Sequence, residues 1–436
     1  MPSEARACAH LVLRRVFEQG AYADRAFHAA AGSLSQRDRA LSMRIAYGAI
    51  QRTGTLDHVL ARLAGRPTQK LDGAVLTALR TGLYELIYMS GPAPHAIVND
   101  AVELVKRSGS RGEKLVNATL RRAVRERASL LDGVHDRDPE SAAIAHSHPP
   151  WLASMWWTQL GPERARALLA ADNEPAETTV RVNTLLAEPA TVVPLLPSDG
   201  QLASLLGVEL PEALVLDAPF DLVGSQLWRD GTILAQARAA MLVAHVLAPR
   251  PGERVLDLCA APGGKSTHIA ALMGGHGEVV AVERDPVRAG HLRETVARMQ
   301  AHSVKVLEAD AEMPMQGPAA GSFDRVLLDA PCSGLGTLQA HPDLRWRMTP
   351  ERIVELAELQ ARMLAVAANA VTVGGTLVYS TCTISRTENE QQIEAFLQSR
   401  PDFAVAPPAT SERYFTTLPS EHRTAGFFIA RLRRDA

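Results

Sequence analysis

Apolar positions in the first 130 residues recur at the spacing of helices. Ala7, Leu11, Leu13, Val16 and Phe17 fall at such intervals, in a segment rich in Ala, Leu and Arg. Further helical stretches follow the capping-type residue Ser35 and cover residues 71–89, 95–106 and 112–127. No alternating strand pattern interrupts them. The pattern predicts an all-α bundle over residues 1–130.

The pattern changes after residue 130. Residues 131–150 are rich in Asp and Pro and are predicted to be a linker, and a helix is expected from Trp151 to about Ala171. Residues 178–183 then alternate like a strand. Shorter strand candidates cover 206–210, 213–216 and 225–228. We expect a small α+β module over residues 151–235.

From Gly252 onwards, strand and helix patterns alternate. Strands are predicted at 254–258, 278–282, 304–307, 325–328, 375–380 and 427–432. Helices are predicted at 265–273, 287–299, 350–371 and 388–399. Repeated βα units indicate an α/β, Rossmann-like domain over 236–436 with a mostly parallel, doubly wound sheet. Its ligand site is expected at the carboxyl ends of the strands.

Composition and charge narrow the class of protein. With 46% apolar and 22% charged residues, no long apolar run and four scattered cysteines, the chain is typical of a cytoplasmic globular protein without a membrane segment. Residues 1–130 hold 20 of the 46 Lys and Arg residues but only 11 of the 48 Asp and Glu residues. This asymmetry fits either a module that binds a polyanion or solvated helix faces, and charge alone leaves both open.

A glycine-containing loop follows the strand at 254–258. Gly263 and Gly264 allow the backbone to approach a ligand at the start of a helix. A phosphate-binding Walker loop is excluded because Cys259 stands where that motif needs glycine, and the dinucleotide fingerprint is absent as well. A nucleoside-binding βαβ unit remains, and the loop residues are its first candidates.

Three acids follow successive strands of this domain. They are Glu283, Asp310 and Asp329. Each one singly fits a solvated strand end, whereas three together favour a ligand with hydroxyl and amino groups.

The cysteines differ in context. Cys8, in an apolar helix, and Cys259, in a tight turn, are interpreted as packing residues. Cys332 and Cys382 follow strands at the expected ligand edge, which favours a nucleophilic thiolate. No metal site is expected, because two cysteines are too few for a closed zinc site and no histidine cluster accompanies them.

Three motifs in this order resemble those of a known family. Residues 260–265 (AAPGGK), 329–333 (DAPCS) and 380–383 (STCT) are similar to motifs of the NOP/Sun family of AdoMet-dependent RNA cytosine-C5 methyltransferases. The similarity continues through 341–346, 388–390 and 426–430. Residues 47–48, 83–86, 94–95, 98–99 and 116–118 resemble the NusB fold. This arrangement resembles the RsmB (Sun) type, whose substrate is small-subunit (16S) ribosomal RNA.

The resemblance implies a cofactor site and catalytic roles. AdoMet would be held by the loop residues Cys259, Ala260, Ala261, Pro262, Gly263, Gly264 and Lys265 together with Glu283, Asp310 and Asp329. Glu283 stands where the family usually has Asp and would bind the ribose, and Asp310 would face the adenine. Cys382 matches the family's nucleophile, Cys332 its product-release cysteine and Asp329 its acid. The thiolate would add to C6 of cytosine and activate C5 for methylation.

The resemblance also implies an RNA partner. We expect Arg121, Arg122 and Arg125 on a basic helix face, with Lys265, to bind ribosomal RNA, and we expect a monomer that binds neither DNA nor membranes. A tRNA substrate and a non-catalytic RNA-binding or assembly role remain as alternatives. An amino-group methylase is disfavoured because Asp329-Ala-Pro-Cys332 replaces its usual motif.

Overall fold

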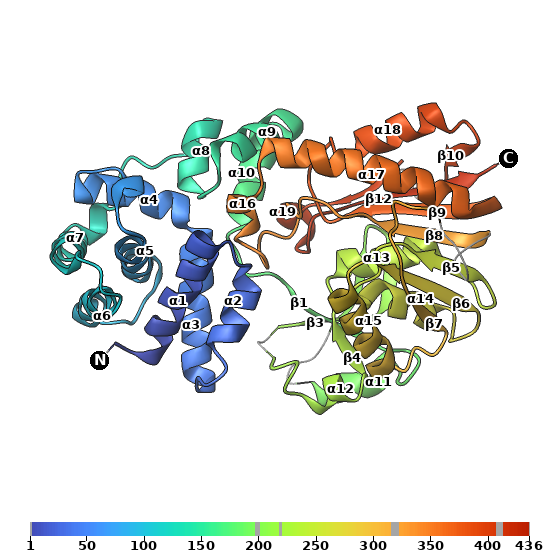
Figure 1. The fold of residues 1–436 in the computed structure, drawn as a ribbon, viewed down its shortest axis with the longest axis horizontal. Coiled ribbons are helices and arrows are strands. Elements are labelled where there is room, and N and C mark those ends of the chain that lie inside the picture. Colours follow the sequence, from blue (N-terminus) through green and yellow to red (C-terminus); the bar gives the residue numbers. More distant parts are fainter. Residues whose placement is uncertain (1, 197–200, 218–219, 315–321, 407–412, 436) are drawn as a thin grey trace. The chain divides into compact units, whose positions relative to one another are not determined.

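The computed structural model describes residues 2–196, 201–217, 220–314, 322–406 and 413–435 (Figure 1). The chain divides into two compact units. The first comprises Met1–Glu174 and Leu338–Arg347, and the second comprises Pro175–Thr337 and Met348–Ala436. Each unit encloses its own hydrophobic core.

The first unit is built from helices. Ser35 accepts a hydrogen bond from the Asp38 amide and starts one of them, and Leu13, Ile45 and Leu79 are fully buried in the common core. The described residues of this unit contain no strand, so the prediction of an all-α bundle is confirmed. The helices are α1 (Glu4–Gln19), α2 (Ala23–Ala30), α3 (Gln36–Gln51), α4 (Thr53–Ala64), α5 (Gly73–Tyr88), α6 (Pro94–Arg107), α7 (Glu113–Arg125), α8 (Pro139–Ala145), α9 (Pro150–Leu160), α10 (Pro162–Ala171) and α16 (Leu344–Arg347).

Two segments of this unit differ from the expectation. The stretch expected to be a linker contains α8, because Asp138 and Ser141 form a reciprocal capping box that starts a helix. The single helix expected after Trp151 is two helices. Gly161, with φ of 80°, ends α9, and Pro162 begins α10.

Ten residues from late in the chain, 338–347, complete the first unit. Arg345 is fully buried and donates hydrogen bonds to the carbonyl oxygens of Ser147 and Asp172. The indole nitrogen of Trp346 donates to the carbonyl of Ile50 at 2.7 Å. These bonds to backbone oxygens explain why this segment joins the helical unit although its neighbours in sequence belong to the second unit.

The second unit contains a small antiparallel sheet of order β2-β3-β1-β4. Its strands are β1 (Thr178–Val182), β2 (Gln201–Leu205), β3 (Val208–Leu216) and β4 (Ile233–Ala235), accompanied by α11 (Pro189–Val192). The two candidates at 206–210 and 213–216 therefore form one strand, β3. The strand expected at 225–228 is wrong, because Ser225 accepts a hydrogen bond from the Trp228 amide and caps the short helix α12 (Gln226–Arg229).

The main sheet of this unit has the order β10-β12-β9-β8-β5-β6-β7, and β11 pairs with β12. The five strands from β9 to β7 are parallel, β12 pairs antiparallel with β9, and β10 and β11 each pair antiparallel with β12. This confirms the mostly parallel sheet. The strands are β5 (Arg254–Asp257), β6 (Glu278–Glu283), β7 (Val304–Glu308), β8 (Phe323–Asp329), β9 (Val371–Thr381), β10 (Phe403–Val405), β11 (Phe415–Thr417) and β12 (Phe427–Arg434).

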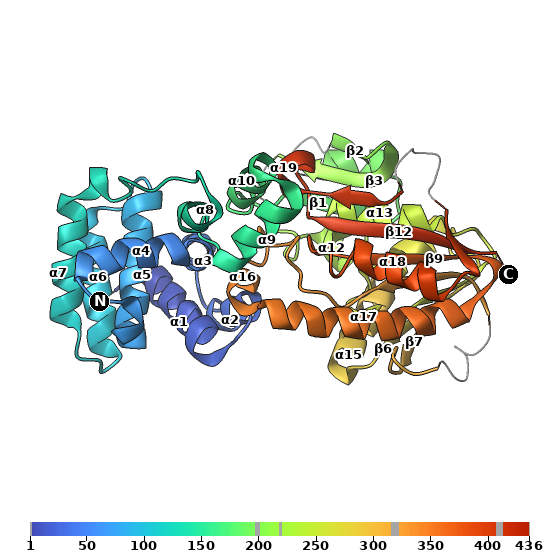
Figure 2. The ribbon, with the colours of Figure 1, turned by 90° about the horizontal axis from the view of Figure 1, so that it is seen from above.

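Helices cover both faces of the main sheet (Figures 1 and 2). One core cluster joins the sheet to α13 (Arg238–Leu247), α14 (Gly264–Leu272) and α15 (Pro286–Arg298). A second cluster joins the other face to α17 (Pro350–Ala370) and α18 (Glu390–Ser399), and α19 (Pro419–His422) precedes β12. The sheet is therefore doubly wound. No helix in the described ranges is long and apolar enough to span a membrane.

Candidate active site

A cavity of about 330 Å³ lies at the carboxyl ends of the parallel strands. Residues that follow β5, β6, β7, β8 and β9 all reach it, because parallel strands end at the same edge of the sheet. The wall includes apolar side chains of α17, namely Leu356, Leu359 and Met363. Of the site residues predicted from the sequence, those that line this cavity are Cys259, Ala261, Glu283, Asp310, Asp329, Cys332 and Cys382.

The other predicted cofactor residues shape the loop but do not line the cavity. They are Ala260, Pro262, Gly263, Gly264 and Lys265. Gly263 has φ of 107°, and a Cβ atom there would lie 2.9 Å from a methyl group of Leu292. Burial raises the pKa of the Cys259 thiol well above its ordinary value, so this cysteine stays protonated.

Three carboxylates face the cavity from successive strand ends. Glu283 is buried, accepts a hydrogen bond from the Asp285 amide at 3.0 Å and lies 3.3 Å from the guanidinium of Arg288. Asp310 is exposed and Asp329 is half-buried. Carboxylate oxygens at these positions are able to accept hydrogen bonds from the hydroxyl and amino groups of a nucleoside.

The two candidate catalytic thiols lie side by side, although 50 residues separate them in the chain. Cys332 Sγ and Cys382 Sγ are 3.4 Å apart. Strands β8 and β9 are parallel neighbours with Asp329 opposite Ser380, so the loops that follow them meet. The hydrogen bond with Cys382, together with burial, raises the pKa of Cys332 well above its ordinary value.

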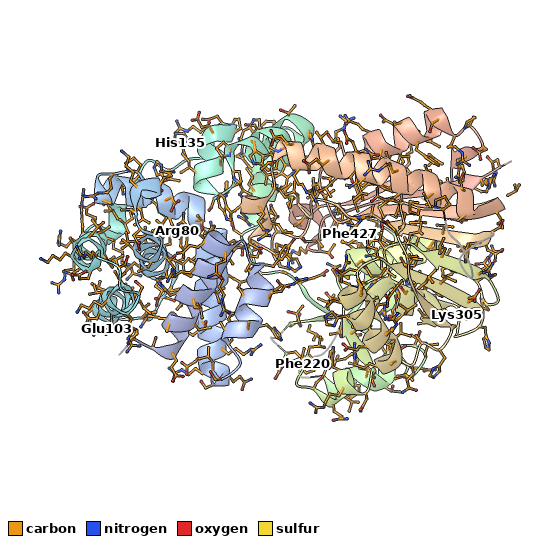
Figure 3. The ribbon with its side chains drawn as sticks, in the orientation of Figure 1. Arg80, Glu103, His135, Phe220, Lys305 and Phe427 are labelled. Atoms are coloured by element: carbon orange, nitrogen blue, oxygen red, sulfur yellow. The ribbon has the colours of Figure 1, made fainter. Side chains whose placement is uncertain are left out.

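Lys265 lies at the centre of the site's electrostatics. Its Nζ atom donates to Asp329 Oδ2 at 2.6 Å and lies 5.3 Å from the ring centre of Phe427, which Figure 3 labels. Burial disfavours the charged form of Lys265, but Asp329 and Cys382 outweigh this effect and raise its pKa. The ammonium of Lys265 is therefore charged. The Ser380 hydroxyl donates a hydrogen bond to the other carboxylate oxygen of Asp329, Oδ1, at 2.7 Å.

A buried carboxylate that the sequence analysis gave no role joins the two cysteine loops. Glu388 accepts hydrogen bonds from the Ser333 amide at 2.8 Å, the Ser333 hydroxyl at 2.6 Å and Gln360 Nε2 at 3.1 Å. The Ser333 hydroxyl in turn lies 2.6 Å from Thr383 Oγ1. Ser333 follows Cys332 and Thr383 follows Cys382, so Glu388 fixes both loops. Its place in the 388–390 motif was the available signal.

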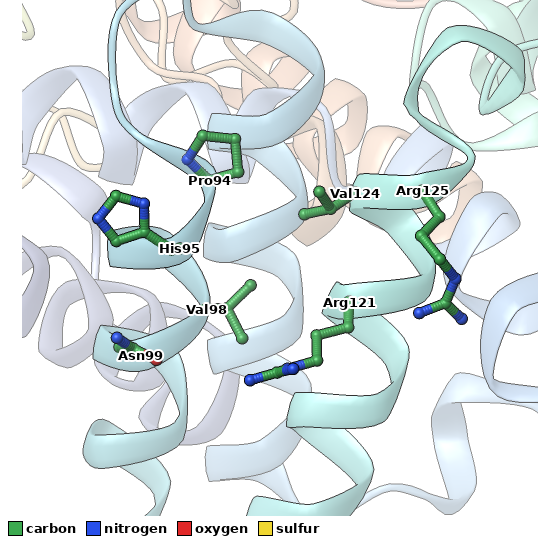
Figure 4. A pocket seen from close by; sticks show the side chains of 7 residues that line it. All are labelled: Pro94, His95, Val98, Asn99, Arg121, Val124 and Arg125. Carbon is green, nitrogen blue, oxygen red and sulfur yellow. The ribbon is translucent and has the colours of Figure 1, made fainter.

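Two of the predicted RNA-binding arginines border a pocket in the first unit. Arg121 and Arg125 of α7 are exposed and line a hollow of about 480 Å³ against α6, with His95 and Asn99 on the opposite wall (Figure 4). Arg122 lies outside this pocket and pairs with Glu126 at 2.7 Å. The structure therefore groups Arg121 and Arg125 but not Arg122, and Lys265 instead pairs with Asp329 beside the cavity of the second unit.

The doubly wound sheet and the site at its carboxyl edge define a Rossmann-like methyltransferase domain. Comparison with known families agrees. Residues 244–433 match the family described as 16S rRNA methyltransferase RsmB/F, residues 3–125 match the NusB family, and residues 148–223 match the ferredoxin-like domain of the RsmF/B-like methyltransferases.

Full-length relatives are similar throughout. The chain is 36% identical to a Synechocystis protein named "Probable ribosomal RNA small subunit methyltransferase B", with 99% of each chain covered. It is 33% identical to the ribosomal RNA small subunit methyltransferase B of Vibrio cholerae, covering 99% of this chain and 97% of that one. The chain therefore belongs to the RsmB/F family of ribosomal RNA small-subunit methyltransferases.

Solved structures share the fold. The crystal structure of PH0851 is similar over the full length of both chains, with a TM-score of 0.79 and 27% identity. A methyltransferase homologue from Pyrococcus horikoshii covers 69% of this chain and all of its own, with a TM-score of 0.60 and 27% identity.

Proposed function

We propose that this protein methylates C5 of a cytosine in 16S ribosomal RNA, with AdoMet as the methyl donor and through a covalent bond between Cys382 and C6 of the base. The observation that carries the proposal is the pair of thiols 3.4 Å apart on the wall of a cavity that three carboxylates also line. Transfer to an amino nitrogen needs no thiol, whereas transfer to C5 needs a nucleophile at C6. We expect the protein to act in the cytoplasm as a monomer.

The cavity suits AdoMet. Glu283, Asp310 and Asp329 offer acceptors for ribose hydroxyls and the adenine amino group, and the α17 side chains offer an apolar wall. The structure of NSun6 from Pyrococcus horikoshii was solved with SFG, an AdoMet analogue, which supports the same cofactor class here. AdoMet supplies a methyl group bonded to a positively charged sulfur.

Cys382 acts as the nucleophile in this proposal. The ammonium of Lys265 stabilises its thiolate, which adds to C6 and forms the S–C6 bond while electron density moves towards C5. When C5 accepts the methyl group, the bond between that methyl group and the donor sulfur breaks and a neutral thioether remains. A base, which can be a water molecule, then takes the C5 proton, the C5–C6 double bond re-forms, the S–C6 bond breaks, and its electron pair returns to the Cys382 sulfur.

Cys332 and Asp329 assist these steps. The raised pKa of Cys332 keeps its thiol protonated. Because the two sulfur atoms are 3.4 Å apart, this S–H can donate a hydrogen bond to the departing Cys382 sulfur. Asp329 orients Lys265 through the 2.6 Å contact. The target base must leave its stack to enter the cavity.

The substrate contact is assigned to the first unit. Arg121 and Arg125 present two cations on one helix face for phosphate oxygens, and the pocket beside them holds polar groups of His95 and Asn99 for base or sugar contacts (Figure 4). Arg122 is expected to contribute less because Glu126 already neutralises it.

The test uses AdoMet carrying a tritiated methyl group. The wild-type protein and variants are incubated with bare 16S rRNA or with bulk tRNA, and the RNA is digested to nucleosides. We expect label in 5-methylcytidine from rRNA, none with Cys382→Ala, and unchanged label with Cys8→Ala, which removes a buried cysteine of the first unit. With Cys332→Ala we expect a protein–RNA adduct that persists on a denaturing gel.

Other outcomes contradict the proposal in distinct ways. Label confined to tRNA would refute the rRNA assignment. An adduct that needs Cys332 but not Cys382 would reverse the roles of the thiols. Absence of AdoMet binding would refute the catalytic function and leave an RNA-binding or assembly protein.

A further inference from the structure

A buried cluster of metal-ligand side chains lies outside the catalytic cavity. Glu212 is on β3, His245 on α13 and His268 on α14, and none of them lines that cavity. Glu212 Oε1 is 2.7 Å from Nε2 of His245 and 2.7 Å from Nε2 of His268. In the described part of the chain, these three groups bring one carboxylate and two imidazole ligand atoms within 4.8 Å of one another.

His268 lacks a hydrogen bond at either ring nitrogen. Its side chain is about 1% exposed, and neither Nδ1 nor Nε2 has a hydrogen-bonding partner. The Nε2 atom is close to Glu212 Oε1, but its N–H direction does not meet that oxygen. Buried polar atoms are nearly always satisfied, so a buried imidazole with neither ring nitrogen hydrogen-bonded indicates that a partner is missing at this cluster.

The guanidinium of Arg181 does not donate a hydrogen bond to the Glu212 carboxylate. It is fully buried and donates to Gln236 Oε1, to Thr267 Oγ1 and to the carbonyl oxygen of Gly264. Among the described residues, the Glu212 carboxylate lies 2.7 Å from Nε2 of His245 and 2.7 Å from Nε2 of His268. Glu212 therefore remains available for a further cation.

We propose that Glu212, His245 and His268 form a binding site for one divalent transition-metal ion, with Zn²⁺ as the preferred occupant. Two histidines and one carboxylate are a common zinc ligand set, which leaves a fourth position for water. His245 is partly exposed and provides the side from which that water and the ion enter. Ligand atoms on one tetrahedral zinc lie about 3.3 Å apart, so each 2.7 Å pair separates by only about half an ångström.

The position of the site indicates a structural role. Zinc would tie β3 of the small sheet to α13 and α14 of the methyltransferase domain, all within the second unit. Helix α14 begins at Gly264, directly after the glycine loop of the catalytic cavity. The ion would therefore fix the helix that carries Lys265 and hold the small module against the core. This inference does not depend on the proposed methylation reaction.

The experiment measures zinc on the full-length protein, purified without a histidine tag and stripped with a chelator. Zn²⁺ is titrated against a competing chromophoric chelator, and bound metal is counted by mass spectrometry. We expect one equivalent of Zn²⁺ for wild type and at least ~100-fold weaker binding for His268→Gln and for His245→Gln. His276→Gln, an exposed histidine that follows α14, is the matched control and should bind like wild type.

The thiol pair is the competing zinc site and needs its own control. The titration is repeated with Cys332→Ser and Cys382→Ser combined, where we expect zinc binding to persist. Co²⁺ loaded into wild type should give the visible absorption of a nitrogen and oxygen site without the charge-transfer band that thiolate ligands add. The melting temperature of wild type should rise with Zn²⁺ and return with chelator.

Three results would overturn the inference. The first is absence of tight zinc binding by wild type. The second is binding that disappears with the cysteine variants but survives His268→Gln. The third is a Co²⁺ spectrum with thiolate charge transfer. The wild-type titration and spectrum keep the test decisive even where a histidine variant fails to fold.

Discussion

Replacing Glu388 by alanine is the sharpest test of how the site is held together. Glu388 is fully buried and accepts hydrogen bonds from the Ser333 amide, the Ser333 hydroxyl and the Gln360 side chain. Because Ser333 follows Cys332 and Thr383 follows Cys382, loss of this carboxylate should loosen the loops that carry both candidate catalytic cysteines. The expected phenotype combines reduced stability of the second unit with slow methyl transfer.

The magnitude follows from which donors remain satisfied. In Glu388→Ala, the hydrogen bond between the Ser333 hydroxyl and Thr383 Oγ1 (2.6 Å) remains, and Gln360 Nε2 still donates to the carbonyl oxygen of Pro331 at 2.9 Å. The Ser333 amide loses its acceptor, and the Ser333 and Thr383 hydroxyls, which both lie within hydrogen-bonding distance of Glu388, keep only each other, so one hydroxyl proton loses its acceptor as well. The amide alone costs about 1–3 kcal/mol. The cavity left by the side chain raises the total to about 2–4 kcal/mol. Loop displacement of about 1 Å lowers kcat by about 100-fold.

Glu388→Gln serves as the conservative rescue. Its carbonyl oxygen still accepts from the Ser333 amide and Gln360, and its NH₂ group can donate to the Ser333 hydroxyl. We expect this variant to lose at most about 1 kcal/mol of stability and to keep most of the activity. Glu390→Ala, two residues away and half-buried, should change stability by no more than about 0.5 kcal/mol.

The assay combines urea unfolding with hydrogen exchange of peptides that cover residues 371–399, which assigns the loss to this domain. Turnover is measured at saturating AdoMet, alongside AdoMet affinity. We expect kcat to fall while AdoMet affinity changes little, since Glu388 does not line the cavity. Equal stability of Glu388→Ala and wild type, or equal losses in the alanine and glutamine variants, would refute the reasoning.

Three further predictions concern charge. Lys265→Met should lower kcat by about 100-fold and slow alkylation of Cys382 at neutral pH, because the thiolate loses its ammonium. Burial raises the pKa of Asp257 to about 6, so the stability that its protonated form contributes is full below about pH 4 and lost as pH rises through 6. Asp257→Asn should therefore gain up to about 3 kcal/mol over wild type between pH 4 and 7 in pH-dependent unfolding. Arg121→Ala with Arg125→Ala should weaken rRNA binding and reduce the salt slope by about 1.5 in filter binding.

Each of these has a contradicting outcome. Unchanged alkylation in Lys265→Met would remove Lys265 from thiolate stabilisation. A pH-independent stability difference for Asp257→Asn would show that Asp257 is ionised without cost in the folded protein. An equal effect of Arg122→Ala on the salt slope would mean that the whole helix face, rather than the pocket, contacts phosphate.

Local signals in the sequence were enough for the fold class. Helical spacing identified the first unit, and alternating strand and helix patterns identified the Rossmann-like domain, because both follow from which face of an element is buried. Elements governed by a single capping contact were missed. Ser225 turns 225–228 into a helix and Asp138 starts α8, and both effects depend on one side chain rather than on periodicity.

The candidate site was determined by the sequence only as a set of strand ends. Parallel strands end at one edge, so Glu283, Asp329 and Cys382 could be expected to face the same cavity. The contact between Cys332 and Cys382 was decided by the pairing of β8 with β9 and by its register. Neither is encoded in local spacing.

Buried polar contacts were decided by the tertiary structure alone. The 388–390 motif marks Glu388 but not its contacts with the two cysteine loops, and Glu212, His245 and His268 are too far apart in the chain to suggest a cluster. What gives them a role is burial, since a charged or polar group removed from water must find partners, and those partners come from whichever elements the fold brings alongside.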